Sequence, residues 1–111
     1  MYNVNEIKPN FYSIALNENV QGGSDALDFS SVLYNLIDKK AVCIIIDLQN
    51  VELMNSSGLG MLVSGFKTLK QNDINMCLMN LTEKIRNLLE MTHLNQVFIT
   101  YQSIEEAINS N

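Results

Sequence analysis

The chain is poor in residues that hold metals, staple loops or perform chemistry. Its 111 residues include no tryptophan, one proline, one histidine and two cysteines. Cys43 and Cys77 lie in separate apolar runs, and no cysteine or histidine pair has the spacing of metal ligands. We therefore expect two buried free thiols, no disulfide, no metal and no cofactor.

Basic residues and long hydrophobic runs are also scarce. Seven lysines and arginines stand against twelve carboxylates, giving a net charge of −5, and the basic residues are scattered. This excludes a nucleic-acid surface, which needs clustered basic residues. Apolar runs such as Val42–Ile46 are far short of a bilayer, and the first ten residues lack a signal-peptide core. We expect no membrane insertion and a cytoplasmic location.

The remaining composition is that of a folded domain. Hydrophobic residues make up 47% of the chain and charged residues 17%. No repeat, low-complexity stretch or linker divides the sequence. We expect one globular domain across residues 1–111.

Apolar periodicity alternates between the strand and the helix type along the chain. Strands are expected at residues 2–8, 11–16, 41–48, 74–79 and 97–101, and helices at 26–39, 57–71, 83–91 and 104–108. The alternation predicts an α/β fold with a mixed central sheet of four to five strands and about four helices.

Helix faces and caps can be assigned from the same pattern. The apolar side of the first helix is expected to contain Leu27, Val32, Leu33, Leu36 and Ile37, and that of the second Leu59, Leu62, Val63, Phe66 and Leu69. Expected helix caps are Ser24 and Asp25, then Thr82, then Ser103 with Glu106 in a capping box.

The most informative segment runs from the buried strand at residues 41–48 into Asn55-Ser56-Ser57-Gly58. Two hydroxyls at a helix start lie where unpaired N–H groups and the helix dipole favour negative charge. Such a site can accept a phosphate. An ordinary helix cap is the alternative, and Ser57 is expected to be that cap.

This segment is not expected to be an enzyme active site, because the residues that would have to accompany the serines and glycines are missing. Gly58–Val63 contains an incomplete dinucleotide-binding pattern, and no lysine follows as a phosphate-binding loop requires. The nucleophile-elbow pattern of serine hydrolases is absent. His93 follows a helix and is expected in a surface loop. We therefore expect no catalytic residue.

The segment Asp47–Leu62 resembles the signature of the STAS-domain anti-sigma factor antagonists, and the order of elements along the whole chain is similar to that family. The resemblance implies that Ser56 is phosphorylated by a partner that is both an anti-sigma factor and a serine/threonine kinase. It also implies that a serine phosphatase reverses the modification, and that the unphosphorylated form binds the kinase and frees the sigma factor. Ser57 would be a secondary phosphorylation site. The family commonly has Asp where this chain has Asn55.

The expected partner surface combines the loop at residues 17–23 with the start of the second helix. Its residues are Asn19, Gln21, Gly22, Met54, Asn55, Ser56, Ser57, Gly58, Leu59 and Met61. The two methionines would offer adaptable apolar contact. For both, packing inside the protein is the alternative.

A second function remains open for the same fold. The chain could be a STAS scaffold without phosphorylation, or an accessory protein of a membrane transport complex. The consecutive serines favour the phosphorylated module, whereas Asn55 leaves room for the scaffold.

Overall fold

The computed structural model describes residues 2–16, 19–21 and 24–110, with the backbone alone at residues 24 and 25. Along the chain the elements are β1 (Tyr2–Lys8), β2 (Phe11–Leu16), α1 (Ser24–Asp38), β3 (Cys43–Asp47), α2 (Ser56–Gln71), β4 (Asn75–Met79), α3 (Glu83–Met91), the short 3₁₀ helix η1 (Leu94–Gln96), β5 (Ile99–Tyr101) and α4 (Ile104–Asn109). The predicted α/β architecture is confirmed.

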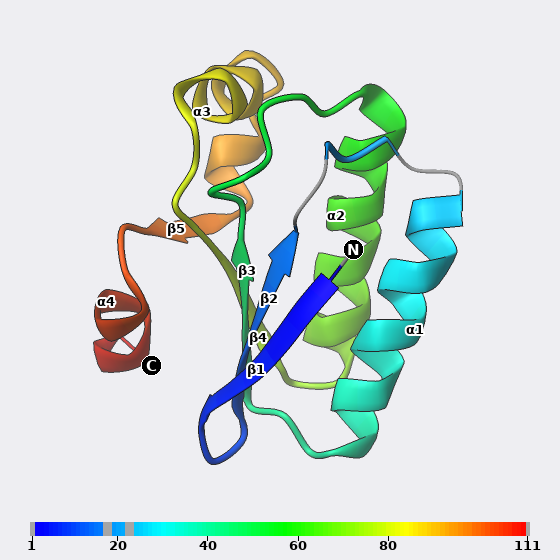
Figure 1. Cartoon of the computed structure of the whole chain (residues 1–111), viewed down its shortest axis with the longest axis vertical. Helices are drawn as coiled ribbons and strands as arrows, with labels where there is room; N and C mark the ends of the chain where they lie inside the picture. Colours follow the sequence, from blue (N-terminus) through cyan, green and yellow to red (C-terminus); the bar gives the residue numbers. More distant parts are fainter. Residues whose placement is uncertain (1, 17–18, 22–23, 111) are drawn as a thin grey trace.

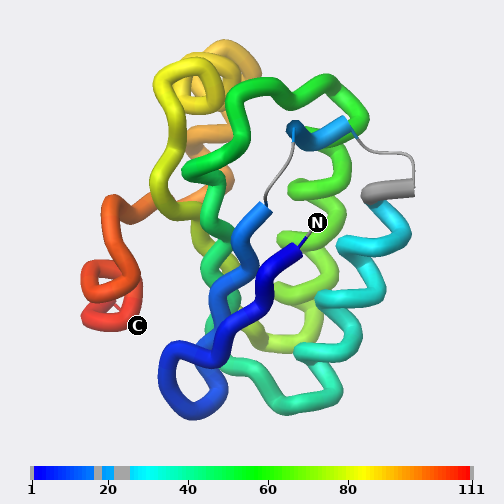
Figure 2. Tube along the Cα trace, in the orientation of Figure 1, coloured from blue at the N-terminus to red at the C-terminus, as the bar shows by residue number. Residues whose placement is uncertain are grey.

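The five strands form one mixed sheet in the order β1-β2-β3-β4-β5. β1 and β2 are antiparallel, while β2, β3, β4 and β5 are parallel neighbours (Figure 1). Parallel strands end at the same edge of the sheet, so the segments that follow β2 and β3 emerge side by side. This arrangement brings residues 19–21 next to the segment that leads into α2 (Figure 2).

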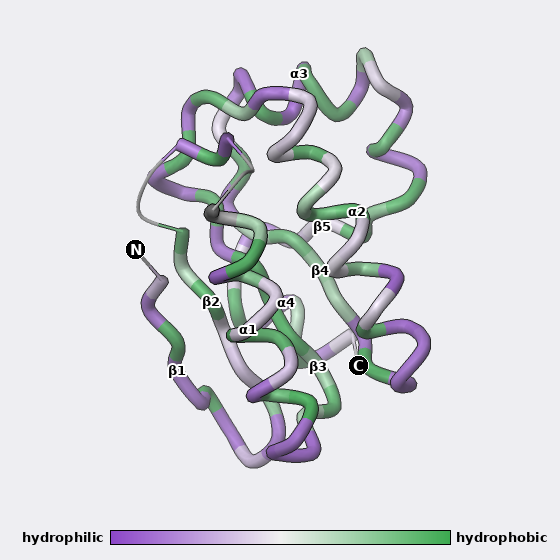
Figure 3. The backbone as a smooth tube through the Cα atoms, turned by 90° about the vertical axis from the view of Figure 1, so that its right-hand side faces the viewer, coloured by the Kyte–Doolittle hydropathy of each residue, from purple (hydrophilic) through white to green (hydrophobic). Residues whose placement is uncertain are grey.

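The sheet is covered on both faces, which explains why β3 is apolar at successive positions. Ile44 and Ile46 face the larger core, to which α1, α2 and α3 contribute. Cys43 and Ile45 face a smaller core beneath α4, which lies across the sheet from α1 and α2 (Figure 1). Hydrophobic residues accordingly concentrate along the central strands, while much of β1 and the loops is hydrophilic (Figure 3).

Both cysteines are buried free thiols, as the sequence predicted. Their strands are parallel neighbours, with Cys43 opposite Asn75 and Ile45 opposite Cys77. The thiols therefore lie diagonally across the strand pair. A hydrogen bond with the Cys43 thiol, together with burial, raises the pKa of Cys77 well above its usual range. Cys77 is accordingly a packing residue rather than a reactive nucleophile.

The structure corrects one residue of an expected helix face and the start of the last expected strand. Leu27 was expected on the apolar side of the first helix but is 73% exposed, and Phe29 is buried in the core instead. The expected strand at 97–101 is shorter, because His93 adopts a left-handed conformation and η1 occupies the next three residues. His93 is exposed, as expected for a surface loop.

The expected caps of the later helices are confirmed, and those of α1 lie outside the described side chains. The hydroxyl of Thr82 accepts a hydrogen bond from the Ile85 N–H, and that of Ser103 accepts one from the Glu106 N–H. The side chains of Ser24 and Asp25 are outside the part of the chain that the structure describes.

Leu62 and Leu27 form a matched pair for testing the core assignment, because one is fully buried and the other 73% exposed. Leu62→Ala should lower the free energy of unfolding by about 3 kcal/mol, since it removes packed methyl groups and leaves a cavity. Leu27→Ala should change it by less than about 0.5 kcal/mol. Urea unfolding of both variants measures the two free energies of unfolding. Equal decreases would contradict the assignment of Leu62 to the core and Leu27 to the surface.

Candidate functional site

Asn55 begins α2 as its N-cap. Its backbone is extended, with φ −88° and ψ 179°, and its side-chain oxygen accepts a 2.8 Å hydrogen bond from the Gly58 N–H. Its own carbonyl accepts the first helical bond, from the Leu59 N–H at 3.0 Å. Ser57 was expected to cap this helix and does not. An extended residue directly before the helix is required for capping, and Asn55 has that position.

Ser56 and Ser57 are the first two helical residues of α2, and both are exposed. The first turn carries no acidic side chain. A helix start of this kind has a partial positive charge of roughly half an elementary charge, which favours an added anion. The Ser56 hydroxyl is therefore accessible, in a position where a phosphate would be tolerated by the fold.

Residues 19–21 are joined to the segment before α2 through the backbone N–H and the backbone carbonyl of Val20. The Val20 N–H donates to the Leu53 carbonyl at 3.1 Å, and the Val20 carbonyl accepts from the Asn55 N–H at 3.2 Å. These bonds form an isolated parallel bridge between Val20 and Met54. We call this contact the Val20 bridge. It places the residues after β2 directly against the N-cap of α2.

The side chain of Asn19 reinforces the Val20 bridge. Its amide oxygen accepts hydrogen bonds from the Glu52 N–H at 3.3 Å and the Leu53 N–H at 3.1 Å. Asn19 was expected to contact a partner. In the structure its side-chain oxygen is used inside the molecule, so its clearest role is to position the loop.

Gly58 is required at its position by the Val20 bridge. A Cβ atom placed on Gly58 would lie 2.3 Å from the Val20 carbonyl oxygen and 3.0 Å from Met54 Cγ. The first of these neighbours is backbone and cannot move without breaking the bridge. Close approach of the loop to the helix thus explains this glycine. The other glycine of the same turn, Gly60, has open space around it.

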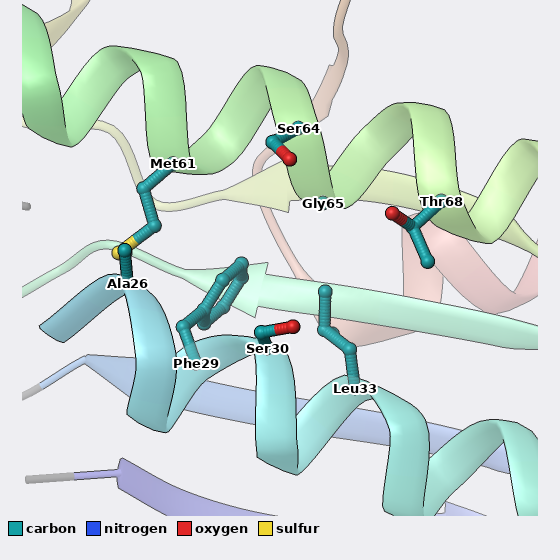
Figure 4. Close-up of a pocket in the computed structure, with 8 residues that line it drawn as sticks. All are labelled: Ala26, Phe29, Ser30, Leu33, Met61, Ser64, Gly65 and Thr68. Atoms are coloured by element: carbon teal, nitrogen blue, oxygen red, sulfur yellow. The ribbon is translucent and has the colours of Figure 1, made fainter.

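The expected partner residues divide into an exposed and a buried group. Asn19, Gln21, Asn55, Ser56 and Ser57 are exposed, whereas Met54, Gly58, Leu59 and Met61 are buried, and Gly22 lies outside the described residues. Met54 is 8% and Met61 6% exposed. Both methionines are therefore packed inside the protein, which was the alternative to contact with a partner. Met61 points from α2 toward Ala26 of α1 (Figure 4).

The space between α1 and α2 does not provide a ligand site. The cavity lined by Phe29, Met61 and Gly65 has a volume of only about 50 Å³ (Figure 4). Small-molecule sites usually enclose about 300–1,000 Å³. A Cβ on Gly65 would meet Phe29 and Leu33 at 2.9 Å, so the two helices are in tight contact here.

The described part of the chain contains no group of three or more His, Cys, Asp or Glu residues that could hold a metal ion. None of the helices in the described residues has the length and apolar character needed to cross a bilayer.

Two residues of the site were missed by reading the sequence, namely Val20 and Leu53. Val20 contributes only backbone groups to the bridge, and a backbone contact leaves no side-chain signal. Leu53 is 57% exposed, although the nearby apolar residues Val51 and Met54 are buried. No strand or helix period governs this connecting segment, so its pattern could not separate the exposed residue from the buried ones.

Gly58→Ala and Gly60→Ala test the Val20 bridge as a matched pair within one helix. Gly58→Ala should destabilise the protein by about 2 kcal/mol or more, in the range of overpacking. Gly60→Ala should stabilise it by up to about 1 kcal/mol, because alanine is the better helix former and meets no neighbour. Thermal and urea unfolding measure both. Stabilisation by Gly58→Ala would contradict the close contact with Val20.

Comparison with known proteins identifies the family. The STAS domain model matches residues 2–107. An anti-sigma-B factor antagonist from Listeria monocytogenes is 34% identical over 73 residues. That match includes 66% of this chain and 63% of the relative, so the chain spans less than two thirds of the length of this curated relative.

Solved structures share the fold at low sequence identity. The phosphorylated form of the Bacillus cell fate determinant SpoIIAA superposes with a TM-score of 0.73 at 17% identity, covering 99% of this chain and 98% of that one. A sulfate transporter family protein from Wolinella succinogenes superposes with a TM-score of 0.82 at 12% identity, covering 96% and 88%. With the family model matched over residues 2–107, the chain belongs to the STAS domain family and has relatives named anti-sigma factor antagonist.

Proposed function

We propose that this protein is an anti-sigma factor antagonist that works as a phosphorylation-controlled binding module in the cytosol. Its unphosphorylated form binds an anti-sigma factor that is also a serine/threonine kinase, and so releases the sigma factor. Phosphorylation of Ser56 ends this binding, and a serine phosphatase restores it. The observation that carries the proposal is the exposed Ser56 hydroxyl at the first position of α2, beside the Asn55 cap.

The physical effect of the modification is a change of charge at a fixed surface. A phosphoserine carries about −1.5 to −2 charges near neutral pH. The helix start accommodates this charge, because the dipole and the backbone N–H groups favour anions there. The Gly58 N–H remains bonded to Asn55 and the Val20 bridge lies in the backbone, so neither needs the Ser56 hydroxyl.

The consequence falls on the partner instead. A partner surface that fits a neutral serine must desolvate a dianion or place it against its own charges. Such a penalty amounts to several kcal/mol, and each 1.4 kcal/mol is a tenfold change in affinity. Two or three orders of magnitude are available without refolding.

Phosphorylation of Ser56 can be detected directly on the protein. When the protein is isolated from the cells that naturally make it, peptide mass spectrometry should find phosphate on Ser56. The modification should be lost in Ser56→Ala and kept in Ser57→Ala, the matched control one residue along the helix. An unmodified Ser56 under growth, stress and stationary conditions would overturn the proposal and favour an unphosphorylated scaffold or an accessory protein of a transport complex.

The side chain of Asn55 lies next to the proposed phosphorylation site, so its charge should affect the phosphate. Asn55→Asp keeps a capping oxygen but adds a negative charge next to the phosphate, which disfavours the second ionisation. In Ser56-phosphorylated chain, the second pKa of the phosphate should therefore rise by about half a unit in Asn55→Asp, for charges roughly 6 Å apart in water. Titration followed by ³¹P NMR measures it. A lower or unchanged pKa would show that the two groups do not face each other.

A further inference from the structure

Leu53 is the exposed large apolar residue of the segment between β3 and α2. Its side chain is 57% exposed, while Val51 is fully buried and Met54 is 8% exposed. It lies three residues before Ser56, in the segment that leads from β3 to the N-cap of α2. A single exposed leucine is common in folded proteins. Leu53 differs because hydrogen bonds to the loop after β2 hold its backbone in place.

The main chain of Leu53 is bonded at both polar groups. Its N–H donates to the Asn19 side-chain oxygen at 3.1 Å, and its carbonyl accepts from the Val20 N–H at 3.1 Å. Both partners come from the loop after β2. The side chain is thus presented to solvent from a backbone that is already fixed, so binding a partner requires no ordering of this segment.

We propose that Leu53 is the apolar anchor by which the protein partner recognises the surface beside Ser56. This inference rests on the proposed function and adds the partner's chemistry. The partner must offer an apolar pocket for one leucine side chain, with a rim that is not acidic, because exposed Glu52 stands directly beside Leu53. A few side chains in well-packed, desolvated pockets carry most of the binding energy of an interface. A side chain whose backbone is already fixed loses less conformational freedom on entering such a pocket.

Binding through Leu53 also explains how a phosphate on Ser56 would weaken the complex. When Leu53 enters a pocket, the partner excludes water from the surface around it. A phosphate three residues away would then lie at the margin of a dry contact, where loss of hydration is costly. The Val20 bridge bonds to the carbonyl of Leu53 and to the N–H of Asn55, so anchor and phosphorylation site are held in one rigid arrangement.

The test compares Leu53→Ala with Ile99→Ala, a substitution of an equally exposed residue at a distant place. Ile99 on β5 is 60% exposed and lines a surface pocket with Lys70 in the last turn of α2. That turn lies about 20 Å along the helix from Ser56, at 1.5 Å per residue. The probe is the purified anti-sigma factor kinase that phosphorylates the wild-type chain, titrated by calorimetry in the absence of ATP.

Leu53→Ala should bind this kinase at least tenfold more weakly, Ile99→Ala within twofold of wild type, and Leu53→Met within about threefold, because methionine can fill the same pocket. Circular dichroism and urea unfolding of each variant confirm that the fold is retained. Wild-type affinity in Leu53→Ala would overturn the anchor and leave the proposed function standing. If no kinase binds or phosphorylates the wild-type chain, both fall together.

Discussion

The backbone contact between Val20 and the segment before α2 is the interaction on which the functional surface depends. The backbone N–H of Val20 bonds to the carbonyl of Leu53, and the backbone carbonyl of Val20 bonds to the N–H of Asn55. Through these two bonds the loop after β2, the connection after β3 and the start of α2 become one unit. The glycine at position 58 is a consequence, because only a residue without a Cβ lets the Val20 carbonyl approach so closely.

The sheet beneath this surface supplies its rigidity. β3 is buried on both faces, between the core shared with α1 and α2 and the smaller core under α4. A strand held in this way fixes where its following loop begins, and the parallel pairing with β2 brings the two loops together. Thr82, which caps α3, also donates a hydrogen bond to the Val51 carbonyl at 3.0 Å and so fastens the loop from a third side. A charge added at Ser56 therefore acts on a surface with little freedom to rearrange.

Sequence reasoning predicted the features that depend on periodicity. The doubly buried strand at β3, the order of the elements and the cap at Thr82 follow from side-chain patterns that local geometry imposes. It failed where tertiary contacts decide. Leu27 is exposed while Phe29 is buried because α2 approaches α1 closely at Phe29, where a Cβ on Gly65 would meet the ring at 2.9 Å. The choice of Asn55 over Ser57 as cap depends on the backbone of the preceding segment, and the exposure of Leu53 depends on hydrogen bonds to Asn19 and Val20.

The central claim is that phosphorylation changes the charge of a rigid surface and leaves the fold intact. Amide ¹H–¹⁵N NMR spectra of the Ser56-phosphorylated and unphosphorylated chain test it most directly. The account predicts chemical-shift changes confined to residues 19–21, to the segment at 51–55 and to the first turn of α2. Large changes throughout the sheet, or loss of the Val20 and Asn55 amide signals to exchange, would contradict it and indicate a conformational switch.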